Sequence, residues 1–298
     1  MKKINRELIG NSILGRVINL HPSDGPLMVI PYAEADVTPT KTEENKSNKP
    51  LSKLYEKKKE KQTLTIAMVL KTEQFDLAPR AIPIKNMPDP EEFGLGSAFV
   101  GEALGDAARS EVIKEAVNLL RNAAKLNRPN YTGWHRWFAP VYRQIFKKEY
   151  HPRRRFRDIQ DLGALLLGEA NKINQDTRMG SGNFVIVSPE IANMLERNSH
   201  GAMSFKLAAT DDEISTSSLN LREVASWAGM AIFSSALLES EEVIVGRKGQ
   251  ERDPGIALVY RKKTFRYDED KLMCNFATKV VGKTGKRMYR YVRLKGNM

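Results

Sequence analysis

The chain lacks most of the residues from which staples and metal centres are built. Its 298 residues include a single cysteine, Cys274, which excludes an internal disulfide. The histidines lie too far apart for any standard zinc spacing, so we expect no metal and no cofactor: His21, His135, His151 and His200. No stretch approaches the roughly 20 apolar residues of a membrane span, and the N-terminus has no apolar signal run. These absences predict a protein of a reducing cytoplasm with no membrane partner.

Enzyme motifs are incomplete. The string Gly282-Lys283-Thr284 resembles the end of a phosphate-binding P-loop, but Ala277 stands where the first glycine belongs, and MYRYVRL after it alternates like a strand. The glycines of GLGSAFVG, from Gly94, lack the preceding strand of a dinucleotide site. No catalytic elbow or histidine pair stands out, and the acidic run Glu239 to Glu242 is interpreted as a solvated face. We therefore expect no enzyme.

One stretch leaves two interpretations open. Residues 180–195, GSGNFVIVSPEIANML, join a glycine-rich turn, an apolar run and Ser188-Pro189-Glu190, a sequence typical of a helix start. Phosphate sites are built from these parts, but so are ordinary joints between a strand and a helix. An acid beside the helix start favours the joint.

Positive charge is the first feature that the chain has in excess. Lys and Arg number 48 against 36 Asp and Glu, a net charge of +12, which favours polyanionic partners. Residues 41–61, KTEENKSNKPLSKLYEKKKEK, are rich in lysine and almost free of apolar residues. In HPRRRFRD, the arginines follow a proline in an expected loop and stay available to a partner: Arg153, Arg154, Arg155 and Arg157.

Aromatic residues alternate with basic ones between residues 121 and 157. This mixture is one pattern of nucleic-acid binding. Helical spacing within it supports a buried stripe, which is the interpretation that we favour for Trp134, Trp137, Phe138, Val141 and Ile145.

The order of elements predicts an α+β protein. Residues 17–33 suggest two short strands around a Pro-Ser-Asp-Gly turn, and the polar residues 38–62 followed by an alternating strand over 63–77 predict a hairpin arm. Apolar spacing predicts helices over 98–126, 158–178 and 189–197, with a polar surface loop over 198–221. The C-terminal part is β-rich, and its last strands form a hairpin closed at residues 282–285.

Four stretches carry a resemblance to a known family: SILGRVINLHPSDGPLMVIPYA, TIAMVLKTEQFDLAPRAIPIKN, GEANKINQDTRMGSGNFVIVSPEIANML and VIVGRKGQERDPGIALVYRK. They resemble the major capsid proteins of large contractile-tailed bacteriophages, which have the Hong Kong ninety-seven type capsid fold shared with encapsulins. The basic RKKTFRYDEDK departs from the family's alanine- and proline-rich strand. A principal shell subunit and a vertex or minor capsid protein both remain open.

The resemblance implies a division of the chain. It assigns residues 1–30 to an N-terminal arm and first strands, 31–78 to an extended hairpin loop, and 79–157 to a peripheral domain with a long spine helix. Residues 158–262 become an axial domain, and 263–298 become return strands that complete the peripheral domain. The strand at 184–187 then belongs to the axial domain, so the stretch 180–195 is a joint.

The function that the resemblance implies is self-assembly into pentamers and hexamers of a virion shell, built in the host cytoplasm around double-stranded DNA. The arm tip is the candidate subunit contact, with Lys53, Tyr55, Lys57, Lys58 and Lys59, and residues 1–16 are a second reaching segment. The arginines of HPRRRFRD are the candidate DNA-facing residues, and scaffold, portal or decoration proteins are further candidate partners. Two alternatives remain: an encapsulin-like compartment shell and a sequence-nonspecific nucleic-acid-binding protein.

Overall fold

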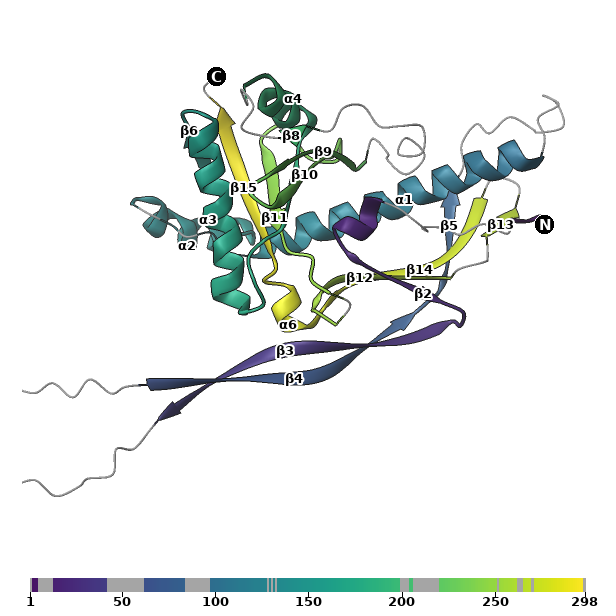
Figure 1. The fold of residues 1–298 in the computed structure, drawn as a ribbon, viewed down its shortest axis with the longest axis horizontal. Coiled ribbons are helices and arrows are strands. Elements are labelled where there is room, and N and C mark those ends of the chain that lie inside the picture. The colour runs from purple at the N-terminus through teal and green to yellow at the C-terminus, as the bar shows by residue number, and fades with distance from the viewer. Residues whose placement is uncertain are drawn as a thin grey trace, which may run out of the picture.

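The computed structural model describes residues 2–4, 13–41, 62–83, 97–127, 129, 131, 133–198, 204–205, 220–250, 252–261, 265–268 and 271–296. Two β-sheets lie on either side of one long helix, and a two-stranded hairpin projects from the body (Figure 1). The predicted α+β composition is thus present.

The hairpin consists of β3 (Leu27–Lys41) and β4 (Gln62–Asp76). The two strands pair antiparallel without a break, from Leu27 opposite Asp76 to Lys41 opposite Gln62. The predicted hairpin is therefore confirmed. Its predicted tip, including Lys53, Tyr55, Lys57, Lys58 and Lys59, lies outside the described residues.

The first sheet has the order β1-β13-β14-β12-β2, and β5 also pairs with β14. Its strands are β1 (Lys2–Ile4), β2 (Asn19–Ser23), β5 (Pro79–Pro83), β12 (Gly255–Arg261), β13 (Phe265–Asp268) and β14 (Lys271–Val281). A short 3-10 helix, η1 (Ile13–Arg16), precedes β2. The turn after β2 does not close a hairpin, because β2 runs parallel to β12 while β3 pairs with β4.

The second sheet has the order β6-β15-β11-β7-β10-β9-β8. Its strands are β6 (Arg153–Phe156), β7 (Phe184–Val187), β8 (Ser204–Phe205), β9 (Arg222–Trp227), β10 (Met230–Ser234), β11 (Glu242–Gly246) and β15 (Tyr289–Gly296). One expectation was wrong here. Arg153, Arg154 and Arg155 lie on a strand and not in a loop, since β6 pairs in parallel with β15, and Arg157 follows the strand. Most of the predicted loop over 198–221, at 199–203 and 206–219, lies outside the described residues.

The predicted final hairpin was also wrong. β14 belongs to the first sheet and β15 to the second, and the short helix α6 (Gly282–Gly285) carries the chain between them. Alternating residues on both sides of a glycine turn satisfy a hairpin pattern, but alternation does not say which strand is the partner. Here β15 finds its partners in β11 and β6.

The longer helices are α1 (Ser97–Leu126), α2 (His135–Phe146), α3 (Ile159–Thr177) and α4 (Pro189–Asn198). The three predicted over 98–126, 158–178 and 189–197 are confirmed. Their ends follow capping chemistry. The Asp158 carboxylate accepts the Asp161 backbone N–H at 2.8 Å, and Arg178 ends α3 in the left-handed region with φ 59°. The Ser188 hydroxyl accepts the Ile191 N–H at 3.3 Å.

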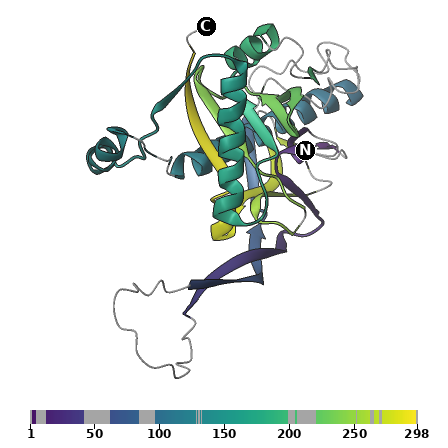
Figure 2. The same cartoon turned by 60° about the vertical axis from the view of Figure 1, so that its left-hand side comes forward.

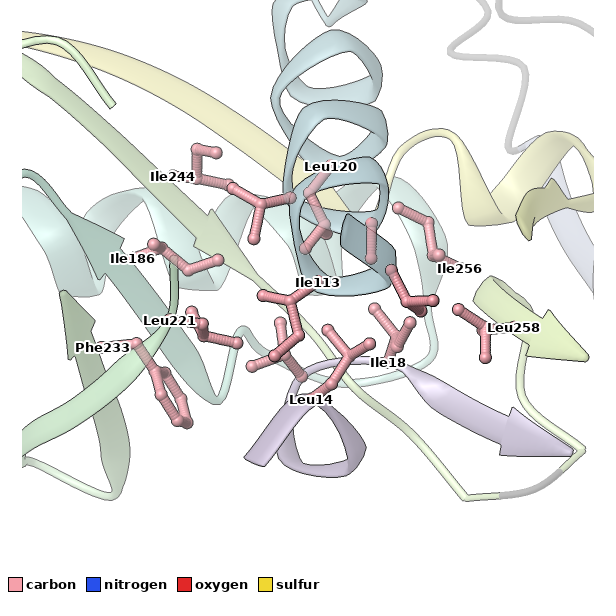
Figure 3. Close-up of a cluster of buried hydrophobic side chains, with 14 of the residues drawn as sticks. Leu14, Ile18, Ile113, Leu120, Ile186, Leu221, Phe233, Ile244, Ile256 and Leu258 are labelled. Carbon is pink, nitrogen blue, oxygen red and sulfur yellow. The ribbon is translucent and has the colours of Figure 1, made fainter. Parts of the chain in front are cut away.

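The main core lies where α1 passes between the sheets. Ile113 and Leu120 of α1 lie between Ile186 and Ile244 of the second sheet and Ile256 and Leu258 of the first, all buried (Figure 3). A second core forms where α3 and α4 cover the other face of the second sheet. Both faces of β7 are therefore buried, which explains why its four residues are all apolar. The glycine-rich stretch before it is a structural joint.

Candidate subunit contacts

The hairpin is tied to the body at the middle of β3 by Glu34, which is 5% exposed. Its carboxylate accepts the backbone N–H of Thr284, at the start of α6, at 2.8 Å, and the Lys71 ammonium at 2.5 Å. Burial would raise the pKa of Glu34, but the hydrogen bonds from Lys71 and Thr284 outweigh it and lower the pKa from 4.5 to about 2. The turn that resembled a P-loop thus holds the protein's own carboxylate.

Apolar contacts reinforce this attachment. Ile30, Tyr32 and Phe75 of the hairpin are buried in a third cluster with strands of the first sheet. Gly282 has φ +66°, and a Cβ there would lie 2.7 Å from the Tyr32 ring. The Ala33 N–H donates to the Arg252 carbonyl at 2.8 Å. The inner face of the hairpin is consequently fixed against the body.

The opposite face of the hairpin carries large exposed apolar side chains, together with Thr72, Gln74 and Asp76. Residues directly opposite each other in an antiparallel pair share a face, and the register places Leu70 opposite Ala33 and Gln74 opposite Val29. We call Leu27, Val29, Ala33, Met68 and Leu70 the outer hairpin face. Its large side chains are exposed, Leu70 to 69%.

Helix α2 contradicts the buried stripe that its spacing favoured. Trp134, Trp137, Phe138, Val141 and Ile145 are all exposed, Trp137 to 81%. Periodicity shows that side chains share a face of a helix, but it does not show what covers that face. We call Trp134, Trp137, Val141 and Ile145 the α2 stripe.

The other side of α2 packs on the segments that flank it. The Phe138 ring lies 5.0 Å from the Tyr150 ring, and Tyr142 lies 5.2 Å from it. The Tyr131 hydroxyl donates to the Tyr150 carbonyl at 2.8 Å. Figure 2 shows α2 projecting from the body.

The candidate DNA-facing arginines lie on and after an edge strand. Arg153, Arg155 and Arg157 are exposed and Arg154 is half-buried, while Phe156 between them is buried in the second core. The Arg153 guanidinium pairs with Glu241 at 2.7 Å. A row of arginines keeps an edge strand from pairing with another chain. It also presents positive charge to a polyanion.

A buried ion cluster joins α1 to the second sheet. It shows that the acidic run Glu239 to Glu242 is not the solvated face that the sequence suggested. Glu242 is fully buried and accepts hydrogen bonds from Arg121 and Lys125, each at 2.7 Å, and from the Tyr291 hydroxyl at 2.6 Å. Burial would raise the pKa of Glu242, but these donors lower it to about 2. The sequence of the run did not indicate that Glu242 is buried, since Glu239 in the same run is exposed. A second acidic run, at residues 211–213, lies outside the described residues.

Neither metal chemistry nor a bilayer is indicated in the described part of the chain. No group of three or more His, Cys, Asp or Glu side chains there could hold a metal ion. No helix among the described residues is long and apolar enough to cross a membrane.

Comparison with known proteins identifies the family. The model of the family described as major capsid protein Gp23 matches residues 102–260, from α1 to β12. No curated protein matches the chain.

Solved structures similar to this chain include the following three. The holo-SrpI encapsulin complex from Synechococcus elongatus PCC 7942 is 12% identical, covering 98% of this chain and 91% of that one, with a TM-score of 0.44. A structure from Mycobacterium phage Bobi is 9% identical, covering 100% of this chain and 92% of that one, with a TM-score of 0.43. The virus-like particle from Pyrococcus furiosus is 8% identical, covering 95% of this chain and 92% of that one, with a TM-score of 0.40.

The family match spans more than half of the chain and includes both α1 and the stretch 180–195. It favours the phage head shell over the compartment shell and the free nucleic-acid-binding protein. The chain belongs to the major capsid protein Gp23 family: it is a structural, non-enzymatic protein of the tailed-phage head shell, located in the virion capsid.

Proposed function

We propose that this capsid protein closes into pentamers and hexamers in which the hairpin of each subunit reaches its neighbour. The observation that carries the proposal is the asymmetry of the hairpin: its inner face is fixed to the body through Glu34 and Tyr32, while its outer face carries large exposed apolar side chains. A rigid arm with one free apolar face suits a heterologous contact that repeats around a ring.

The lysine-rich tip is proposed to make part of the same contact. In the sequence, Lys53, Tyr55, Lys57, Lys58 and Lys59 lie between β3 and β4, and these two strands project from the body (Figure 1). Main-chain pairing along an extended segment gives affinity without demanding one angle between subunits. Residues 1–16 are a second candidate for reaching a neighbour.

The division of the chain into capsid domains is part of the proposal. Residues 79–157, with α1 as the spine, would form the peripheral domain, and residues 158–262, with β7, the axial domain. Residues 1–30 and 31–78 would be the N-terminal arm and the extended loop. Residues 263–298 would return to the peripheral domain; β14 suits this assignment, whereas β15 pairs within the sheet of β7.

Packaged double-stranded DNA is the proposed partner of the inner surface. The net charge of +12 and the exposed Arg153, Arg155 and Arg157 support binding through phosphates without sequence preference. Arg154 would contribute from the same strand. Scaffold, portal or decoration proteins are further candidate partners.

The register of the hairpin allows a direct test. Because Lys41 pairs with Gln62, residues 42–61 can be replaced by Asn-Gly, which closes a two-residue turn without disturbing β3 or β4. We expect wild-type protein to form rings or shells in negative-stain electron microscopy and sizing chromatography, and the shortened protein to remain a folded subunit. A wild-type monomer at every salt concentration contradicts the assembly proposal. Normal shells from the shortened protein contradict the role of the tip.

A further inference from the structure

The large exposed apolar side chains of the described residues fall almost entirely into two groups. One group is on the hairpin and includes Leu27, Val29, Met68 and Leu70; the other is on α2; Leu126 is the exception. In Figure 1 α2 lies well above the hairpin, and in Figure 2 α2 projects to the left of the body while the hairpin projects downward. One subunit therefore carries two separate apolar surfaces that do not cover each other.

The α2 stripe is as large as the largest apolar patch of a typical monomer. Its four side chains, Trp134, Trp137, Val141 and Ile145, present roughly 550 Å², since a large aromatic side chain contributes about 150–250 Å² when fully exposed. The largest apolar patch of a typical monomer is about 300–600 Å², and patches of this size are often functional. The stripe would supply about two thirds of the roughly 800 Å² that each partner contributes to a standard interface.

Helix α2 also has little stability of its own. It spans 12 residues and contains Pro140, which removes an internal hydrogen bond. Isolated helices of this length are marginal in water, and the Phe138 and Tyr142 rings of α2 pack on Tyr150 of its own C-terminal flank. A partner on the exposed side would stabilise it.

We infer that the outer hairpin face of one subunit docks on the α2 stripe of the adjacent subunit. The inference rests on the proposed role of the hairpin as an arm, and it names the surface that receives the arm. Each subunit then gives one hairpin and receives one, which is the head-to-tail arrangement that closes a ring.

Charge supports this pairing over a contact between two copies of α2. The α2 segment carries four basic residues and the single acid Glu149, so two copies would repel each other: Arg136, Arg143, Lys147 and Lys148. The outer face of the hairpin carries Asp76 opposite Leu27, and none of the residues that share this face between Leu27 and Ala33 or between Leu70 and Asp76 is basic. The two surfaces are therefore apolar at the centre and opposite in charge at the rim.

Disulfide trapping tests the contact directly. The sole native cysteine, Cys274, is fully buried and burial raises its thiol pKa to about 12, so it does not compete. In assembled shells, the Leu70→Cys/Val141→Cys variant should form a ladder of intermolecular disulfides, while each single variant should give no ladder. The matched control is Leu70→Cys/Glu196→Cys, which places the second cysteine on an exposed position of α4. Shells without a ladder overturn the inference and leave the proposed assembly intact, whereas wild-type protein that never assembles overturns both.

The sign of a charge on the hairpin gives a second readout. Next to a basic helix, Leu70→Lys should lower the yield of shells several-fold more than Leu70→Glu, although both variants remove the same apolar side chain. Equal yields contradict docking on α2. A basic helix that bears tryptophan could instead bind a lipid bilayer, and anionic phosphatidylserine vesicles test this alternative. A blue shift of the tryptophan fluorescence on adding vesicles, together with no disulfide ladder, assigns α2 to a bilayer and overturns the inference.

Discussion

Replacing Glu34 with glutamine should loosen the hairpin from the body and should do so in a pH-dependent way. Glu34 is buried, and its pKa of about 2 compares with 4.5 for the unfolded chain. At about 1.4 kcal/mol for each pKa unit, the ionised carboxylate contributes on the order of 3 kcal/mol to the free energy of unfolding at neutral pH. Glu34→Gln should lose most of this because the amide carries no charge for Lys71.

The pH dependence follows from the direction of the shift. Since the pKa in the folded protein lies below the unfolded value, the contribution is complete above about pH 5 and disappears as the pH falls through about 2. Less than half of it is left at about pH 3. The difference in stability between wild type and Glu34→Gln should therefore narrow on acidification, even though Glu242 makes both proteins less stable in acid.

Urea unfolding of unassembled subunits at pH 7 and pH 3 measures this difference, and hydrogen exchange of β3 and β4 locates it. Glu73→Gln is the matched control, because it removes the same charge from the same hairpin at a half-exposed position. The control should change stability by no more than about 0.5 kcal/mol. Equal losses for the two variants at pH 7, or a loss from Glu34→Gln that does not change with pH, would refute the reasoning.

Three further changes test the packing. Gly246→Ala should cost about 1–3 kcal/mol in urea unfolding, because the new Cβ would lie 2.1 Å from the buried Phe184 ring; Phe184→Leu in the same protein should recover part of the loss, and no recovery contradicts the clash. Tyr291→Phe should cost about 1.5–3 kcal/mol, since it removes a donor to the buried Glu242 carboxylate, and an unchanged unfolding midpoint would exclude that role. Cys274 should react with a maleimide in urea but not in the native protein, and rapid native labelling would contradict its burial.

Local chemistry in the sequence was enough to predict the helices and the hairpin. Apolar spacing marked α1 and α3, and Ser188 with Pro189 marked the start of α4. Alternation on both sides of a polar segment marked β3 and β4. These elements were predictable because each depends on residues that are close together in the chain.

Strand partners were not predictable in the same way. The alternation in β14 and β15 fixed which residues share a face, but the partner of β15 is β11 and the partner of β2 is β12. Pairing of this kind depends on the packing of the whole molecule.

Burial of charge and exposure of apolar residues were missed for a related reason. Glu242 is buried only because α1 brings Arg121 and Lys125 to it, and the sequence of the acidic run carries no trace of that contact. Glu34 did carry a usable signal, since it continues the inward positions of Ile30 and Tyr32 on β3. A charged residue at a buried position of an alternating strand predicts a specific partner.

The parallel pairing of β2 with β12 has a consequence for how the subunit is made. Asn19 pairs with Ala257, so the first sheet cannot close until the chain has been made and released from the ribosome at least as far as β12. At about 5–20 residues per second, α1 would wait on the order of ten seconds or more for the strands that cover it. Such long-range pairing slows folding and leaves apolar surface exposed meanwhile. Nascent subunits therefore become competent for assembly only after β12 and β14 have been made, which keeps shorter nascent chains out of the shell.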